Sequence, residues 1–384
     1  MAVVRVASFN VENLFARPAA FNAETRATGN QVLADYREFN TLIGNPVYSA
    51  ADKQRMRDLL VALDVYYLNI HGAVRRRFTQ SPKWAWLRKN RGSFDREPTD
   101  TSADVEVVAA GRGSWIGWVE LATEAVNETG TRMTARVIAD VDADVLAIVE
   151  AEDRPSLIRL NEELLEGRYR HLMLVDGNDE RGIDVGIMTK PGFPIRSIRS
   201  HVDAEDARGA IFSRDCCEYE VGTPSGAVLK VLVNHFKSQS GGGGSKRRRQ
   251  ADRVRRIVDG LVDDGDRVVV LGDLNEGPPA LDEPPPNLAS LFDPNGPLVS
   301  CYDLAGFDVG DRPGTFAPCA LDDRLDYILL TTALQPAFRG GEVFRKGVWG
   351  DRKTRPTAWE TYPEMTESVH QASDHAAVVI QLDL

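Results

Sequence analysis

The chain has 384 residues, 42% hydrophobic and 27% charged, a composition typical of a globular protein with a sizeable core. Its net charge of −11 argues against a protein that coats nucleic acid nonspecifically through bulk positive charge. An enzyme that handles a phosphodiester with a metal ion and local basic patches is not excluded. Four cysteines without a CxxC pair argue against a disulfide scaffold and against a zinc site.

The N-terminus leads from Met1 directly into an apolar segment, without the basic and apolar regions of a signal peptide. No apolar run approaches the length that a membrane span needs. We therefore expect a cytoplasmic protein without membrane insertion, although a chain trimmed of a signal peptide would look the same. The sequence indicates no obligate protein partner.

Short runs rich in β-branched residues alternate with amphipathic segments, which is the pattern of an α/β protein. We expect helices at 51–67, 119–140 and 246–262. The expected strands are 3–10, 145–150, 184–189, 210–221, 228–235, 268–273, 327–331 and 376–382.

Six hydrophobic segments share one feature, which is that each ends on, or lies next to, an acid, an amide or an imidazole. These polar residues are Asn10 and Glu12, Glu150, Asn234 and His235, Asp273 and Asn275, Asp326, and Asp374 and His375. A buried carboxylate without a partner is unfavourable, so such strand ends predict ligands that converge on a divalent cation and a phosphate. Hard oxygen donors suit Mg²⁺ or Mn²⁺, with Ca²⁺ also compatible, as one or two ions.

The site candidates run from Asn10 to His375, so one domain must span nearly the whole chain. We interpret residues 1–384 as a single domain with an elaborating insert at about 16–117. The insert contains a basic run, 73–94, that has seven lysines and arginines and no acid.

Taken together, the six segments resemble the motifs of the endonuclease/exonuclease/phosphatase superfamily, the deoxyribonuclease I-like metal-dependent phosphodiesterases. They are most similar to the bacterial nucleases of that superfamily, and the resemblance covers most of the chain outside the insert. It implies an α/β fold, a four-layered sandwich in which two mostly antiparallel sheets pack face to face with helices outside.

The resemblance also implies a set of metal ligands. Glu150 resembles the family's principal ligand, and Asn10 lies beside it. Glu12 occupies the position of a second acidic ligand, and Asp374 resembles the last acidic residue of the metal shell. In isolation, Asn10 would be an ordinary turn residue and Glu150 a solvated strand end.

The catalytic residues follow from the same resemblance. Asp273 and Asn275 match a Gly-Asp-x-Asn motif, in which the carboxylate orients or deprotonates the attacking water. Asp326 and His375 resemble the family's Asp–His pair, in which the carboxylate fixes the imidazole tautomer and raises its pKa. His235 resembles the histidine that faces the scissile phosphate.

Several further residues suggest a nucleic acid substrate. Asn234 and Lys237 are candidate phosphate donors, and a basic helix begins with Arg247, Arg248 and Arg249. The insert interleaves tryptophans with cations, a combination that single strands favour: Lys83, Trp84, Trp86, Arg88, Lys89 and Arg91. The alternatives are a solvated helix face and a small hydrophobic core within the insert.

We therefore predict a metal-dependent phosphodiester hydrolase, an endonuclease or exonuclease that cleaves DNA by in-line attack of an activated water. The alternative is a phosphatase or phosphodiesterase that acts on inositol phosphates, lipids or other small phosphoesters, which the acidic pI would suit. A more remote alternative is an inactive binding scaffold, which the presence of every site residue disfavours. The choice between DNA and RNA stays open at this point.

Overall fold

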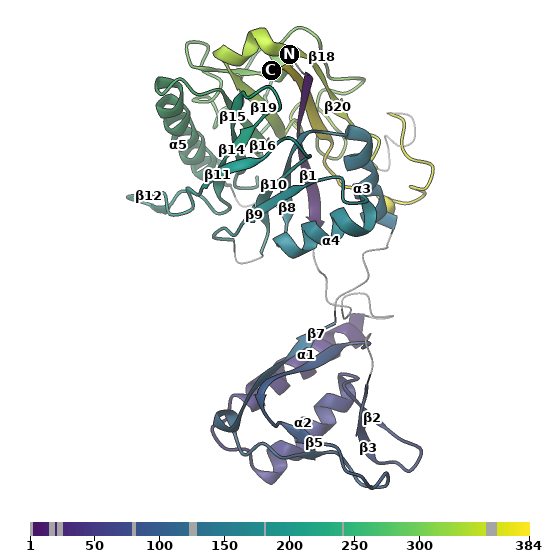
Figure 1. The fold of residues 1–384 in the computed structure, drawn as a ribbon. Coiled ribbons are helices and arrows are strands. Elements are labelled where there is room, and N and C mark those ends of the chain that lie inside the picture. Colours follow the sequence, from purple (N-terminus) through teal and green to yellow (C-terminus); the bar gives the residue numbers. More distant parts are fainter. Residues whose placement is uncertain are drawn as a thin grey trace. The chain divides into compact units, whose positions relative to one another are not determined.

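The computed structural model describes residues 3–14, 20, 26–78, 82–122, 129–179, 182–239, 242–350 and 359–384. The chain divides into two compact units (Figure 1). Unit 1 comprises Met1–Phe15 and Val126–Leu384, and unit 2 comprises Ala16–Ala125. The interpretation of the chain as one domain with an insert at about 16–117 stays a prediction.

Two large sheets form the body of unit 1. The seven-stranded sheet has the spatial order β18 (Phe307–Asp308), β20 (Phe338–Phe344), β21 (Ala377–Asp383), β1 (Val3–Leu14), β8 (Val145–Ala151), β10 (Asp184–Thr189) and β9 (His171–Val175). The six-stranded sheet has the order β11 (Ile195–Arg199), β14 (Cys216–Gly222), β15 (Val228–His235), β16 (Val268–Asp273), β19 (Asp326–Thr331) and β17 (Leu298–Ser300). Most neighbouring strands are antiparallel, but β1 is parallel to β8, β15 is parallel to β16, and the short β18 is parallel to β20.

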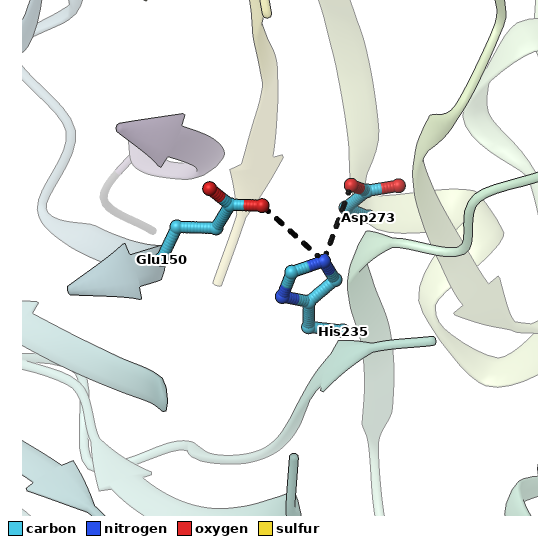
Figure 2. Close-up of side chains that lie close together, drawn as sticks. All are labelled: Glu150, His235 and Asp273. Atoms are coloured by element: carbon cyan, nitrogen blue, oxygen red, sulfur yellow. Dashed lines mark ion pairs between the residues drawn. The ribbon is translucent and has the colours of Figure 1, made fainter. Parts of the chain in front are cut away.

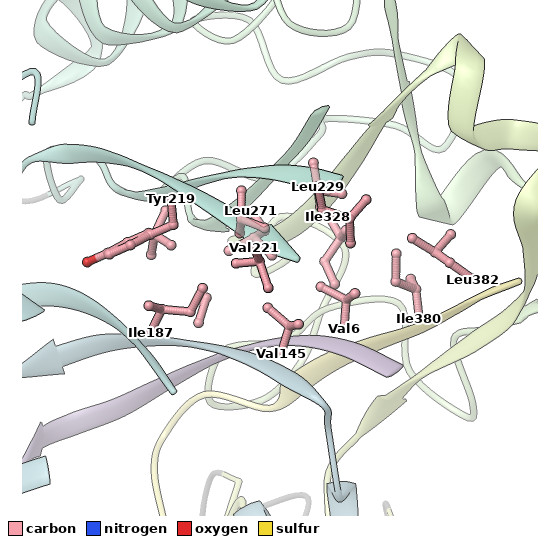
Figure 3. Packing of buried hydrophobic residues seen from close by; sticks show 14 of the residues in the cluster. Val6, Val145, Ile187, Tyr219, Val221, Leu229, Leu271, Ile328, Ile380 and Leu382 are labelled. Carbon is pink, nitrogen blue, oxygen red and sulfur yellow. The ribbon is translucent and has the colours of Figure 1, made fainter. Parts of the chain in front are cut away.

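The two sheets pack face to face through a core to which both contribute (Figure 3). The core residues that the figure labels are Val6, Val145, Ile187, Ile380 and Leu382 from one sheet and Tyr219, Val221, Leu229, Leu271 and Ile328 from the other. Helices α3 (Thr129–Val141) and α4 (Arg154–Leu164) contact the seven-stranded sheet, and α5 (Gly244–Asp263) contacts β16 of the other sheet. The predicted four-layered α/β sandwich is confirmed.

The sequence of β8 explains why this strand is covered on both faces. Its residues Val-Leu-Ala-Ile-Val-Glu-Ala are all buried except Glu150, which is half-buried at the strand end. A continuous apolar run of this kind suits a strand with packing partners above and below. Val145, Ala147 and Val149 therefore face the second sheet, while Leu146 and Ile148 face α3 and α4.

The expected strands are confirmed except for 210–221, which is divided into β13 (Gly209–Ala210), paired with β12 (Glu205–Asp206), and β14. Two expected helices are wrong in extent. The first, α2 (Ala50–Ala62), ends before Asp64, whose positive φ of 60° stops the helix. The second starts only at Thr129, because residues up to Leu121 belong to β7 (Trp115–Leu121), in which buried and exposed side chains alternate. Helices α1 (Arg26–Ile43) and α4 were not predicted.

Unit 2 has its own hydrophobic core. Helices α1 and α2 accompany three two-stranded sheets: β2 (Tyr66–Leu68) with β3 (Val74–Arg76), β4 (Ala85–Gly92) with β7, and β5 (Asp95–Arg96) with β6 (Glu106–Val107). Phe94 is fully buried between Phe39 and Trp115, with ring centroids 6.0 and 4.5 Å apart. Among the described residues of both units, no helix is long and apolar enough to cross a membrane.

A buried carboxylate, Asp95, organises the polar interior of unit 2. It accepts hydrogen bonds from the Tyr66 hydroxyl, the Arg76 guanidinium and the Lys89 ammonium group. Burial alone would raise the pKa of the Asp95 carboxyl, but Lys89, Tyr66 and Arg76 together lower it below its ordinary value. The ionised carboxylate is therefore part of the folded state of this unit.

We expect Asp95→Asn to destabilise unit 2 by about 2–3 kcal/mol at neutral pH, because two partly buried cations lose their partner. The pKa of Asp95 is depressed in the folded state, so its stabilisation is present above the ordinary carboxyl pKa and is lost as the pH falls through the folded value. Urea unfolding followed by tryptophan fluorescence at pH 7 and pH 3 measures both effects. The exposed pair Arg96–Glu106 supplies the control, since Glu106→Gln should leave the midpoint unchanged.

Candidate active site

The sheet topology brings the predicted polar strand ends to one edge of the sandwich. In each sheet, two parallel strands finish side by side, so that Asn10 on β1 lies near Glu150 on β8 and His235 on β15 pairs in register with Asp273 on β16. The antiparallel neighbour β19 begins at this edge, where Asp326 pairs with Asp273.

His235 connects two carboxylates from the two sheets. Figure 2 shows its imidazole between Glu150 and Asp273. The Nε2 atom lies 3.5 Å from Glu150 Oε1 and 3.6 Å from Asp273 Oδ2. Asn10 Nδ2 donates to the same Asp273 oxygen at 3.2 Å. The predicted segments that contain Asn10 and His235 therefore both contact the segment that contains Asp273.

Asp326 and His375 form a buried pair. His375 Nδ1 lies 2.8 Å from Asp326 Oδ2, which also accepts a 2.7 Å hydrogen bond from Thr315 Oγ1. The other ring nitrogen, Nε2, faces the cavity, 3.9 Å from both Asp273 Oδ2 and Asp374 Oδ1. Burial alone would lower the pKa of His375, but the surrounding carboxylates, Asp326 foremost, raise it well above its ordinary value.

Glu12 lies at the edge of the same group of residues. Its Oε2 accepts hydrogen bonds from Gln371 Nε2 and from the Asp374 backbone N–H, both at 2.9 Å. Its own N–H donates to Asn10 Oδ1 at 3.1 Å. Burial, with a further contribution from the charge of Asp374, raises the pKa of Glu12 to about 7.

The donor set fits a hard divalent cation. Glu12, Glu150, Asp273 and Asp374 all have raised pKa values, chiefly through burial and partly through the proximity of other carboxylates. Two triplets of ligand atoms lie within 4.8 Å of one another: Glu150, His235 and Asp273, and Asp273, Asp326 and His375. Asp326 Oδ1 is buried without a hydrogen-bond partner among the described residues. A cation would offset the repulsion that these carboxylates exert on one another.

The backbone is strained at three of the predicted positions. Glu12, Glu150 and Asn275 have positive φ angles of 48°, 67° and 57°. Such conformations cost about 1–3 kcal/mol each for residues with a side chain and gather at functional sites. Gly272, with φ of 130°, allows β15 to approach closely, since a Cβ there would lie 1.9 Å from the Asn234 carbonyl oxygen.

Four of the predicted substrate-binding residues have other surroundings than expected. Asn234 points away from His235 and donates to the Leu232 carbonyl at 3.0 Å. Arg247 is buried and donates to Glu276 Oε2 at 2.6 Å, and Arg249 makes two bonds of 2.7 and 2.6 Å to Asp206. The role of these three residues in phosphate binding stays a prediction. Lys237 is half-buried beside Ser238, to which its Nζ donates at 3.3 Å.

Arg248 is the member of the basic triplet that is exposed, with a 3.3 Å contact to Asn287 Oδ1. Arg247 instead donates to the carbonyls of Lys237 and Ser238 at 3.0 and 3.1 Å. It therefore holds the chain segment that follows His235.

The sequence did not reveal Arg214, which lines the cavity of the site. The cavity measures about 380 Å³ and includes Glu12, Glu150, Arg214, His235, Ser238, Gln239, Asp273, Asn275, Phe316, Asp323, Leu325, Asp374 and His375. Arg214 is buried, lies 3.1 Å from Asp179 Oδ2 and donates to the Phe236 carbonyl at 3.4 Å. It precedes β14, and the start of β14 pairs with the end of β15, so the antiparallel register could have identified it.

Comparisons with known proteins show the family to which the chain belongs. A model of the Endonuclease/Exonuclease/phosphatase family matches residues 92–283, half of the chain, including Glu150, His235 and Asp273. The chain therefore belongs to this family, whose members hydrolyse phosphoesters with divalent metal ions. No curated protein matches the sequence significantly.

The fold is similar to several solved structures at low identity. One is an endonuclease/exonuclease/phosphatase family protein from Bacteroides thetaiotaomicron, with 18% identity, TM-score 0.49, and coverage of 66% of this chain and 89% of that one. Another is a mannosyl-6-phosphatase from the same organism, with 17% identity, TM-score 0.49, and coverage of 67% and 92%. A third is truncated TDP2 of Caenorhabditis elegans, with 16% identity, TM-score 0.47, and coverage of 67% and 91%.

In the metal-free protein, we expect Asp326→Asn to lower the pKa of His375, because the largest of the charges that raise it is removed while the burial that lowers it remains. An NMR titration that follows the Hε1 proton of His375 measures this change. Asp323→Asn is the matched control, because Asp323 lines the same cavity without contacting the imidazole. An equal change in both variants would contradict the assigned pair.

Proposed function

We propose that this protein is a metal-dependent phosphodiesterase and, more specifically, a nuclease that acts on DNA. The observation that carries this proposal is the meeting of buried carboxylates from both sheets with two histidines around one cavity. Membership of a family of phosphoester hydrolases supports the reaction class. The DNA substrate rests on the basic residues near the site and in unit 2.

Glu150, Asn10, Glu12 and Asp374 would hold Mg²⁺ or Mn²⁺, with Ca²⁺ also compatible with their oxygen donors, as one or two ions. When bound, the ion would polarise a phosphoryl oxygen and offset the charge that develops on it. The protein's side chains would supply the orientation and the proton transfers.

Asp273 is suited to accept a proton from the attacking water. The backbone N–H of Asn275 donates to Asp273 Oδ1 at 2.8 Å, and Asn10 holds the other oxygen, so the carboxylate is fixed in place. The raised pKa of Asp273, about 7, makes it a proton acceptor of useful strength near neutral pH. Burial is the main cause of this pKa.

The two histidines are suited to stabilise the phosphate and the leaving group. Asp326 holds Nδ1 of His375, so that Nε2 can donate a hydrogen bond to a phosphoryl oxygen. His235 Nε2 lies between two carboxylates and could protonate the leaving oxygen. We propose direct in-line attack by a water molecule activated near Asp273, without a covalent intermediate.

A phosphatase or phosphodiesterase acting on inositol phosphates, lipids or other small phosphoesters is the second candidate. The observation that favours it is the internal pairing of Arg247 and Arg249, which leaves fewer cations free beside the site for a long polyanion. The net charge of −11 also disfavours the binding of a long polyanion.

We expect Mg²⁺ or Mn²⁺ to support hydrolysis of bis-nitrophenyl phosphate and EDTA to abolish it. Asp273→Asn and His375→Ala should each lower kcat by about 10²–10⁴-fold, because each removes a proton-transfer or charge-stabilising group. Side-by-side digestion of plasmid, single-stranded DNA, RNA and inositol phosphates identifies the substrate class. Wild-type rates in these variants would reject the assigned site, and no hydrolysis of any substrate would favour the inactive scaffold.

Variants of two neighbouring arginines should distinguish an effect on substrate binding from an effect on folding. Arg248→Ala should raise KM for DNA and reduce the salt slope of binding by about 1, while bis-nitrophenyl phosphate hydrolysis stays unchanged. Arg247→Ala should lower the rate on both substrates, because Glu276 and the segment after His235 lose their partner. Arg256→Ala, an exposed change farther along α5, is the control for general charge effects. A DNA-specific loss in Arg247→Ala would contradict this division.

A further inference from the structure

Exposed aromatic side chains gather on unit 2. Within the described parts of the chain, the aromatic residues with more than a third of their surface exposed are Tyr67 (38%), Trp118 (47%) and Phe78 (78%), and all three belong to this unit. Apolar residues exposed singly are common on protein surfaces, but exposed apolar groups that gather in one region mark an interaction site. The sandwich of unit 1 has none among its described residues.

The charge of unit 2 also differs from that of the rest of the chain. Unit 2 carries 15 lysines and arginines and 13 aspartates and glutamates, a net charge of +2. The remainder of the chain therefore carries a net charge of −13, which together with the +2 of unit 2 gives the total of −11. The unit that exposes the aromatic rings is therefore slightly positive, whereas the rest of the chain is strongly negative.

Cations lie beside exposed or half-buried aromatic rings at several positions of this unit. Arg77 lies 5.3 Å from the Tyr67 ring centroid, Arg76 lies 5.7 Å from that of Phe78, and Arg88 lies 4.7 Å from that of Trp86. Arg88 is directly opposite Trp118 in the β4–β7 register, so both side chains project from the same face of that ribbon. We call this set of residues the aromatic track. It consists of Tyr67, Arg76, Arg77, Phe78, Trp86, Arg88 and Trp118.

Part of the track lines a cavity of about 160 Å³. Phe78 and Trp86 line it from different elements, together with Arg76, Arg77 and Lys89. Its cations outnumber their acidic partners, because Arg76 and Lys89 share the single carboxylate of Asp95 while Arg77 pairs with Asp64. The cavity therefore combines two aromatic walls with a net positive charge.

We infer that the aromatic track binds single-stranded nucleic acid. Unpaired bases expose flat π-faces that stack on aromatic side chains, and each stacked base contributes about 1–3 kcal/mol. Arg76, Arg77 and Arg88 pair with Asp95, Asp64 and Glu120, so they would contribute chiefly through cation–π interactions beside the rings. In a duplex the bases stack on one another, so only the electrostatic attraction between its phosphates and the protein would remain. The inference deepens the proposed function, because it names the form of nucleic acid that the enzyme would capture.

Capture by unit 2 would assist catalysis without any direct contribution to the chemistry. The track and the candidate active site belong to one chain, so a strand held by the track has a raised effective concentration for that site. The track residues should therefore affect KM for a strand, and not the turnover of a small diester.

The test is binding of fluorescein-labelled dT20 to the full chain in EDTA, measured by fluorescence anisotropy so that no cleavage occurs. Phe78→Ala combined with Trp86→Ala should raise Kd at least tenfold, and Trp118→Ala alone about fivefold or more. A 20-base-pair duplex should bind more weakly than dT20 to the unmodified protein. Circular dichroism and thermal unfolding check that each variant is folded.

Phe78→Leu guards against a folding defect, because this exposed residue keeps its apolar character and loses only its ring. It should also weaken dT20 binding severalfold. Arg96→Ala, a surface cation of the same unit outside the track, should leave Kd unchanged. Unchanged Kd in the ring variants, an equal loss in Arg96→Ala, or tighter binding of the duplex would overturn the inference.

The same experiment separates this inference from the proposed function. Hydrolysis of bis-nitrophenyl phosphate should be the same in the track variants and in the unmodified protein. Intact dT20 binding with no metal-dependent hydrolysis would reject the proposed function and leave the track in place. If hydrolysis is normal and no ring variant changes the Kd for dT20, the track does not bind the strand. The assigned active site would then still hold.

Discussion

The buried carboxylate of Asp273 is the constraint on which the rest of the site depends. Asn10 from one sheet and His235 from the other both approach its Oδ2 atom, so Asp273 joins the two halves of the sandwich. Burial raises its pKa, the charge of His375 lowers it, and Asp326 and Glu150 raise it again. Charges placed so close together in a poorly hydrated site are stable only when a fold holds them and a cation or proton offsets them. That requirement links the architecture to the chemistry.

The topology explains why a sandwich can supply these groups. One parallel pair in each sheet delivers two strand ends to the same edge, and the antiparallel neighbours start there. The chain must then turn sharply at the ends of the strands. Glu150 and Asn275 take left-handed backbone conformations at these turns, and Gly272 permits contact with Asn234 where a side chain would collide. The backbone strain is therefore located where the side chains are positioned for chemistry.

The sheets and the strand ends could be predicted from the sequence because their signal is local. An apolar run that ends in an acid or a histidine identifies both the strand and the polar group, as at Asp273 and His235. The surroundings of the arginines could not be predicted in this way. Whether Arg247 is buried depends on Glu276, and whether Arg249 is free depends on Asp206, and neither partner is near in sequence. Only the folded chain shows which cations are already paired.

Unit 2 shows the same limit for aromatic residues. The sequence left two alternatives for Trp84 and Trp86, a stacking surface or a small core, and in the structure the two rings have different surroundings. Trp84 packs against the hydrophobic core of the unit, whereas Trp86 lines a cavity beside Arg88. Spacing along the chain cannot separate the two, because the distinction depends on which neighbouring element covers each ring. The exposed rings Phe78 and Trp118 are the ones on which the proposed single strand would stack.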